Sequence, residues 1–264
     1  YKKHIYRIDS ESTGILVIST YRNESKANRT GSIADYWKPS GKRGTFQNVQ
    51  WIDAVDPADR GAYAVGWLNE AGRNSGLAKP AGQLTLKPGD SSIFSRFLAV
   101  GTSPANAFGN VMLYATPAKD VGLLGVQLKD AKTREPIDSA TITIASNGQS
   151  IPAYTIIKGK FAALFPLGSY QVQISDRGRG THKHMVELKS DQSERINTDL
   201  SPLSGVSFAI TGADGKDTPC KVQFIGTGTT KTPNLGPQNR AHGCVDQWHS
   251  ETGKFNVALD PGTY

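Results

Sequence analysis

The chain carries one pattern twice: residues 159–170 read Gly-Lys-Phe-Ala-Ala-Leu-Phe-Pro-Leu-Gly-Ser-Tyr, and residues 253–264 read Gly-Lys-Phe-Asn-Val-Ala-Leu-Asp-Pro-Gly-Thr-Tyr. The two stretches align without a gap and share the leading Gly-Lys-Phe and the closing Gly and Tyr. Self-similarity of this kind indicates two copies of one small structural unit. The sequence therefore predicts tandem domains in the C-terminal part of the chain.

The residues around the repeat alternate between apolar and polar. Large or β-branched apolar side chains recur at every second position of residues 142–144, 170–174 and 255–259. A period of two is typical of strands that bury one face. Gly168 and Gly262 fall between such stretches, where turns are expected. Several short strands with turns about every ten residues predict a β-sandwich.

The repeated unit resembles the carboxypeptidase regulatory-like, transthyretin-like sandwich. The matching features are a strand after Gly125 or Gly205, a strand led by Pro136 or Pro219, and the Gly-Lys-Phe hairpin. This resemblance implies one sandwich at residues 119–201 and a second at residues 202–264. The first copy continues for about 30 residues past its closing tyrosine, whereas the second stops there. We therefore expect the second sandwich to be truncated and the natural polypeptide to continue.

Residues 1–118 form a different region, with strands expected at 15–21, 49–55, 62–69, 84–86 and 91–100. Ser103 followed by Pro104 is typical of a helix N-cap and first turn, and predicts one short helix at 103–115. Residues 86–101 resemble the closing strands of a β-supersandwich similar to mutarotase-like domains, which implies truncation at the start as well. The predicted class is all-β, with tandem sandwiches after a partial supersandwich region.

The formal net charge of +7 comes from basic residues that bunch at 2–3, 38–43 and 177–183. None of these bunches interleaves with aromatic residues in a nucleic-acid motif, so we expect solvated surface charge and no nucleic-acid partner. No apolar run approaches the roughly 20 residues of a membrane span. No nucleophile elbow, phosphate loop or dinucleotide fingerprint is present, and we assign no catalytic or metal-binding residue.

A second resemblance rests on residues 219–226, 232–237, 241–243, 253–255 and 261–264. They are similar to the sandwich that precedes the catalytic domain in CehA/McbA-type metallohydrolases, which are PHP-like phosphoesterases. The resemblance implies that this chain is a non-catalytic accessory portion of an extracytoplasmic bacterial enzyme, with no cofactor of its own. Its partner would be a catalytic domain of the same chain, C-terminal to Tyr264, which would hold any divalent metal.

Two other interpretations stay open. The chain could belong to a cell-surface carbohydrate-binding protein without an enzymatic domain, in which Trp37, Trp51 and Trp67 stack on sugar rings. It could instead be a structural or fibre-forming array that self-associates through the edges of its sandwiches.

The segment between the two cysteines contains the candidate sites. Cys220 and Cys244 predict a disulfide that closes the insertion at 226–243, with free thiols or a zinc site as alternatives. The insertion is long for a connection, which favours a binding or interdomain loop. Its candidate contact residues are Asn239, Arg240, His242 and Trp248.

Overall fold

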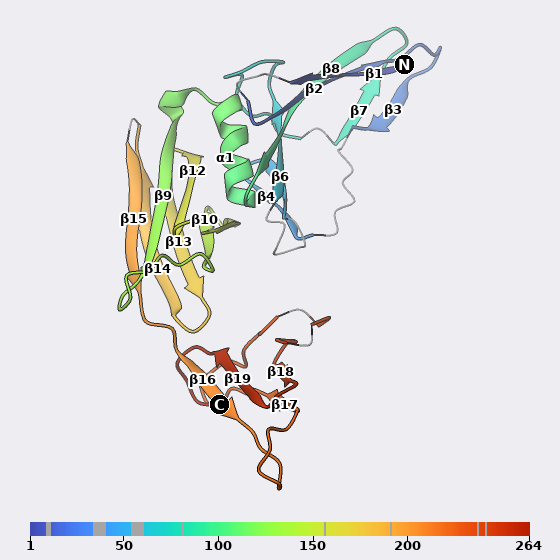
Figure 1. Ribbon diagram of the computed structural model, residues 1–264. Helices are drawn as coiled ribbons and strands as arrows, with labels where there is room; N and C mark the ends of the chain where they lie inside the picture. Colours follow the sequence, from blue (N-terminus) through green and yellow to red (C-terminus); the bar gives the residue numbers. More distant parts are fainter. Residues whose placement is uncertain are drawn as a thin grey trace. The chain divides into compact units, whose positions relative to one another are not determined.

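The computed structural model describes all residues except 9–11, 34–40, 54–60, 81, 156, 191, 237 and 241 (Figure 1). The described chain consists of β-sheets and one α-helix, which confirms the all-β class. It divides into two compact units. The first comprises Tyr1–Leu128, Pro136–Ile174 and Lys183–Thr198, and the second comprises Lys129–Glu135, Ser175–His182 and Asp199–Tyr264.

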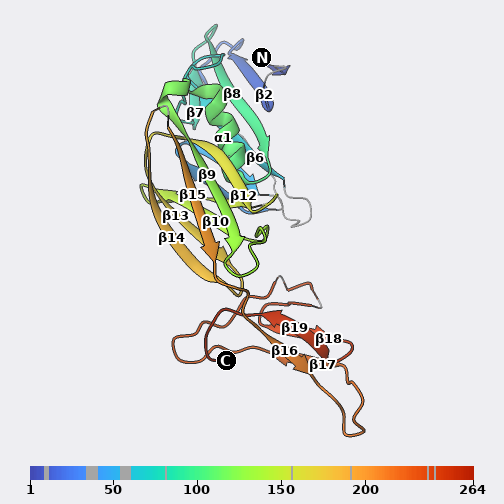
Figure 2. The same ribbon diagram turned by 60° about the vertical axis from the view of Figure 1, so that its left-hand side comes forward.

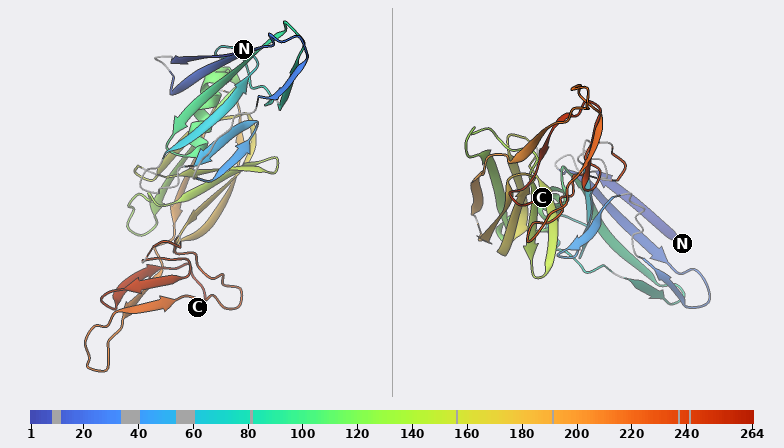
Figure 3. Two further views of the ribbon diagram at one scale, coloured as in Figure 1. Left: turned by 90° about the vertical axis from the view of Figure 1, so that its right-hand side faces the viewer. Right: turned by 90° about the horizontal axis from the view of Figure 1, so that it is seen from below.

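The N-terminal part of the first unit is a six-stranded antiparallel sheet with the order β1-β2-β8-β6-β5-β4 (Figure 3, left). Its strands are β1 (Lys2–Ile8), β2 (Gly14–Arg22), β4 (Arg43–Phe46), β5 (Val49–Asp53), β6 (Ala62–Leu68) and β8 (Ser91–Gly101). A separate antiparallel ribbon pairs β3 (Arg29–Ser32) with β7 (Gln83–Leu86). The strands expected from the sequence are present. In addition, the sheet contains β1 and β4 and the ribbon contains β3, which alternation did not predict.

The predicted helix is α1 (Pro104–Ala115), followed by the 3₁₀ turn η1 (Ala118–Asp120). The Ser103 hydroxyl accepts a hydrogen bond from the Asn106 backbone N–H at 3.2 Å, which satisfies one of the free amides of the first turn. Nine of the twelve helical residues are buried. The helix is therefore enclosed on most sides, as its low polarity requires.

Two sheets of a sandwich complete the first unit, and Figure 2 shows them as two layers. One sheet has the order β11-β10-β13-β14 and the other the order β12-β9-β15. Their strands are β9 (Val121–Asp130), β10 (Thr141–Ser146), β11 (Gln149–Tyr154), β12 (Lys160–Pro166), β13 (Gly168–Asp176), β14 (Gly180–Leu188) and β15 (Ser193–Leu200). The alternating apolar residues fill the space between the layers, where Ile142, Val172 and Ile174 have no exposed surface.

An aromatic cluster joins the sandwich to the N-terminal sheet through α1. It consists of Phe46 from β4, Phe108 from α1, Phe165 from β12 and Tyr170 from β13, each at most 1% exposed. The Phe108 ring centroid lies 5.2 Å from that of Phe46 and 5.4 Å from that of Phe165. The boundary that we expected near residue 118 thus lies inside the first unit, while the three-domain division itself stays a prediction.

The second repeat forms two small antiparallel ribbons in the second unit. One pairs β16 (Gly205–Ala209) with β19 (Lys254–Ala258), and the other pairs β17 (Cys220–Gln223) with β18 (Gln247–Ser250). The register corrects the sequence alignment of the repeats. Phe161 of the first Gly-Lys-Phe lies opposite Val126, and Phe255 of the second lies opposite Phe208. Val126 therefore corresponds to Phe208, two residues beyond the match expected from Gly125 and Gly205.

Candidate functional site

The turn between β13 and β14 carries the most connected polar group of the second unit. Residues 177–180 read Arg-Gly-Arg-Gly. The Arg179 guanidinium contacts two carboxylates, at the end of β9 in one sheet and at the end of β13 in the other. It forms an ion pair with Asp130 and places its Nε 3.0 Å from an Asp176 oxygen, and it donates to the Ser201 carbonyl at 2.6 Å. All three ionised side chains are at most 12% exposed.

The carboxylate of Asp130 is held in its charged form. It accepts the backbone N–H groups of Lys132 at 2.8 Å and Thr133 at 2.9 Å, in addition to the Arg179 guanidinium. The amide of Thr133 and then the guanidinium lower the pKa of Asp130 from 3.8 to about 2, against the opposing effect of burial. The carboxylate therefore stays ionised well into the acid range.

Asp260 fastens the same turn to the second repeat. One of its oxygens accepts the backbone N–H groups of Gly178 at 2.8 Å and Gly180 at 3.2 Å. The Gly178 carbonyl accepts the Ser204 N–H at 2.8 Å. Gly178 has φ +80°, and a Cβ atom there would lie 2.5 Å from the Ser204 carbonyl oxygen. Only glycine allows the turn to approach the chain so closely.

We call Asp130, Asp176, Arg179 and Asp260 the turn clamp. Arg179 pairs with the carboxylates of Asp130 and Asp176, and the Asp260 carboxylate is bonded by backbone N–H groups, so the chemistry of the turn clamp is that of a structural joint. The sequence analysis took the basic bunch at 177–183 as solvated surface charge, and for Arg179 this was wrong. The signal that could have found it is the Arg-Gly-Arg-Gly turn, because glycines on both sides of an arginine indicate a close backbone approach.

Acid is expected to weaken the second unit through Asp130. Because its folded pKa of about 2 is below the ordinary value of 3.8, the carboxylate stabilises the fold fully above pH 4. That contribution is lost as the pH falls from 4 towards 2. The urea concentration at the unfolding midpoint, measured at several pH values between 6 and 2, should decrease between pH 4 and pH 2. Arg179→Gln should lower the midpoint at pH 6 and flatten the fall.

The matched control for this experiment is Arg134→Gln. Arg134 pairs with Asp199, but their side chains are 60% and 47% exposed, so water screens the pair. This variant should keep both the midpoint at pH 6 and its acid dependence. Equal effects of the two substitutions would show that the turn clamp has no special role.

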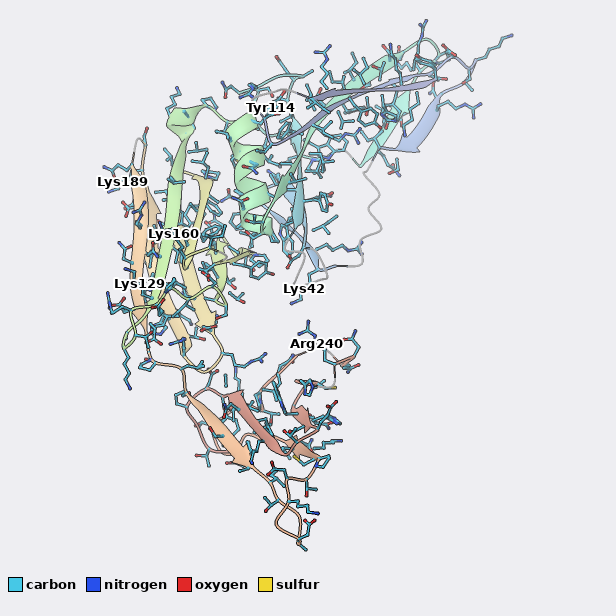
Figure 4. All side chains as sticks on the ribbon, viewed as in Figure 1. Lys42, Tyr114, Lys129, Lys160, Lys189 and Arg240 are labelled. Carbon is cyan, nitrogen blue, oxygen red and sulfur yellow. The ribbon has the colours of Figure 1, made fainter. Side chains whose placement is uncertain are left out.

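The predicted loop brings two of its four candidate residues together. His242 Nδ1 lies 2.7 Å from the His249 carbonyl oxygen, and its ring centroid lies 5.9 Å from that of Trp248. Asn239 and Arg240 are exposed, and Figure 4 shows Arg240 projecting away from β17 and β18. The loop thus presents a basic side chain, an amide side chain and the His242 ring to solvent, whereas the Trp248 ring is half-buried. A binding role for these four residues stays a prediction.

The two cysteines are free thiols in this structure. Cys220 begins β17, whereas Cys244 bridges Gln247, which pairs with Gln223 at the other end of β17. The three residues from Cys220 to Gln223 correspond to about 10 Å of backbone along the strand, beyond the roughly 7 Å between Cα atoms that a disulfide spans. Cys244 Sγ instead donates to the Gln238 carbonyl at 3.3 Å. The expected disulfide is therefore not formed in this structure, and the loop is held by backbone hydrogen bonds of Leu235 and Val245 and by the burial of Leu235.

Trp51 and Trp67, the described members of the three tryptophans considered for sugar binding, lie on opposite faces of the N-terminal sheet. Trp51 lies opposite Ala64 on one face of the N-terminal sheet, and Trp67 lies opposite Arg96 on the other face. Trp51 is 9% and Trp67 is 3% exposed. The Arg96 guanidinium lies 5.3 Å from the centroid of the Trp67 ring. Trp37 lies outside the described residues, so the two described rings act as core side chains.

The comparison with known proteins assigns no family. No family model and no curated protein matches the chain. The Bacillus anthracis TIE protein has 12% identity over 98% of this chain with a TM-score of 0.29, and this chain spans 50% of it. The major pilin subunit BcpA of Bacillus cereus has 9% identity over 76% of this chain and 70% of its own, with a TM-score of 0.27.

A polysaccharide lyase is also similar, with 10% identity over 72% of this chain and 34% of its own, and a TM-score of 0.26. TM-scores this low do not define a common fold, so none of the three similarities carries a functional assignment. Among the described residues, no helix has the length and apolarity to cross a bilayer.

Proposed function

We propose that this chain is a non-catalytic array of β-sandwiches in an extracytoplasmic protein, and that it holds a partner domain in place. The turn clamp carries the proposal. A free linker would leave the turn between β13 and β14 solvated. Here three hydrogen bonds join the backbone of the turn to Ser204 and Asp260, at the beginning and end of the second repeat. Two ion pairs hold Arg179 to Asp130 and Asp176 at the ends of β9 and β13. Polar groups bonded at this density favour a second unit that stays folded as one compact body, as a non-catalytic supporting role requires.

The partner that we propose is a catalytic domain C-terminal to Tyr264, of the PHP-like metallohydrolase class that residues 205–264 resemble. That domain would supply the metal-binding histidines and any divalent metal. The contacts of the possible metal ligands in the second repeat support this proposal. His242 contacts the His249 carbonyl, Cys244 donates to the Gln238 carbonyl, and the His249 side chain is exposed. The described residues contain no group of three or more His, Cys, Asp or Glu side chains that could hold a metal ion.

The test compares the chain with the natural polypeptide. Peptide sequencing beyond Tyr264 should reveal a domain with a His-x-His motif. The whole polypeptide should hydrolyse bis(p-nitrophenyl) phosphate with Mn²⁺, whereas residues 1–264 alone should not. Turnover by residues 1–264 would contradict the accessory role. A polypeptide that ends within a few strands of Tyr264 would favour a binding or structural array.

A further inference from the structure

The two repeats pair their first four strands in the same way. In the first repeat β9 pairs with β12 and β10 pairs with β11, and in the second β16 pairs with β19 and β17 with β18. The first repeat then adds β13 beside β10 and β15 beside β9. Among the described residues of the second repeat, no strand takes either place. The outer edges of β16 and β17 therefore have unused backbone donors and acceptors.

The apolar face beside this edge is only half covered. Phe208, Val222, Trp248 and Phe255 are partly buried, and they pack on a small core of Phe224, Leu235, Val257 and Leu259. The rings of Phe208 and Phe255 stack with centroids 4.8 Å apart, and Trp248 and Phe255 are nearly parallel at 6.2 Å. We call Phe208, Val222, Trp248 and Phe255 the open face.

The first repeat shows what normally covers such a face. Val126 and Phe161 occupy the positions of Phe208 and Phe255, and they are 2% and 7% exposed. The first repeat also has β13 beside β10, and its residues Tyr170 and Val172 are 1% and 0% exposed. In the first repeat a single strand, β13, thus both pairs with the edge of β10 and contributes side chains to the buried core.

Tyr264 in the second repeat makes the same hydrogen bond to the backbone as Tyr170, which lies near the start of β13 in the first repeat. Tyr170 donates its hydroxyl to the Pro166 carbonyl at 2.7 Å, four residues upstream. Tyr264 donates to the Asp260 carbonyl at 3.0 Å, also four residues upstream. Tyr264 is 40% exposed, in contrast to its buried counterpart. Both tyrosines therefore close the same kind of turn, and in the first repeat β13 runs on from it.

We propose that the open face is closed by a strand formed by the residues that directly follow Tyr264 in the natural polypeptide. This strand pairs with the outer edge of β17. It places large apolar side chains at the second and fourth positions after Tyr264, which correspond to Val172 and Ile174. The inference rests on one part of the proposed function, namely that the polypeptide continues beyond Tyr264. It does not depend on which domain follows.

The experiment supplies the strand from the chain itself. A variant carries residues 171–200 appended after Tyr264, so that Tyr264 takes the place of Tyr170. Amide hydrogen exchange at Lys221 and Gln223 in β17 is compared with that of residues 1–264. The appended strand should slow exchange there at least tenfold while leaving β10 unchanged, since β10 already has its partner. The matched control appends the same residues with the copies of Val172 and Ile174 changed to Asp.

The control should leave exchange in β17 as fast as in residues 1–264. Equal protection by both appended segments, or protection by neither, would overturn the proposal. Residues 1–264 also serve to test a second copy as the occupant. Protection of β17 that rises with protein concentration and is lost in Val222→Asp would assign the open face to self-association and overturn the proposal. Failure of the hydrolase assay would leave this result untouched.

Discussion

Replacing Phe165 by alanine is expected to lower the free energy of unfolding of the first unit by about 3–5 kcal/mol. The ring has no exposed surface and lies against Phe46, Phe108 and Tyr170, with centroid distances of 6.2, 5.4 and 5.4 Å. A cavity at this point removes contacts to the N-terminal sheet, to α1 and to β13 together. Urea unfolding followed by tryptophan fluorescence would measure the loss.

The same variant tests whether the sheet and the sandwich unfold as one. Because the Phe165 ring contacts both, Phe165→Ala should speed amide exchange in β6 as well as in β13. The control is Tyr6→Ala on β1, whose side chain is 67% exposed, and which should change stability by no more than about 0.5 kcal/mol. Faster exchange confined to the sandwich would show that residues 1–118 fold independently.

Substitution of the glycine that opens the repeat is expected to be nearly as damaging. Gly159 has φ +68°, and a Cβ atom there would overlap the Leu128 carbonyl oxygen. Gly159→Ala should cost roughly 1 kcal/mol for the left-handed backbone and roughly 1–3 kcal/mol more for overpacking. Its carbonyl accepts the Leu128 N–H at 2.8 Å, so a shifted backbone would also weaken the link between β9 and the hairpin.

Gly148 provides a matched control in the same sandwich. It has φ +75°, but nothing lies within 4 Å of a Cβ atom at this turn between β10 and β11. Gly148→Ala should therefore show only the backbone cost of roughly 1 kcal/mol. The difference between the two melting temperatures isolates the steric part. Equal losses at both positions would mean that close approach is not the reason for the glycine at 159.

The repeat could be predicted from the sequence because its signals are local. Gly253 has φ +73° and its carbonyl accepts the Ile210 N–H at 3.0 Å, which matches the geometry at Gly159. The requirement for glycine follows from a turn of a few residues. The Ser103 hydroxyl likewise accepts a hydrogen bond from the backbone N–H of Asn106, only three positions away, so the start of the helix could also be predicted. Period-two alternation identified the strands between these points.

The turn clamp and the aromatic cluster could not be predicted, because they join residues far apart in the sequence. Asp130 and Arg179 are 49 positions apart, and Gly178 and Asp260 are 82 positions apart. The Arg-Gly-Arg-Gly turn indicates a close backbone approach, but nothing local identifies the carboxylates with which Arg179 pairs. The two cysteines show the same difference between local and distant information. Spacing indicates that Cys220 and Cys244 could close a loop, whereas their positions in the strand register, with both thiols free in this structure, depend on pairing between strands.

The two-residue offset between the repeats bears on how such units diverge after duplication. Successive side chains of a strand alternate between faces, so a slip by an even number of residues keeps every apolar side chain in the interior. The displacement that makes Phe208 the counterpart of Val126 is of this kind. A shift by an odd number of residues would move every buried side chain of the strand to the solvent-facing side. Two copies of a repeat can therefore shift their strand register by two residues and still bury the same face. An alignment of such repeats should allow register shifts of an even number of residues.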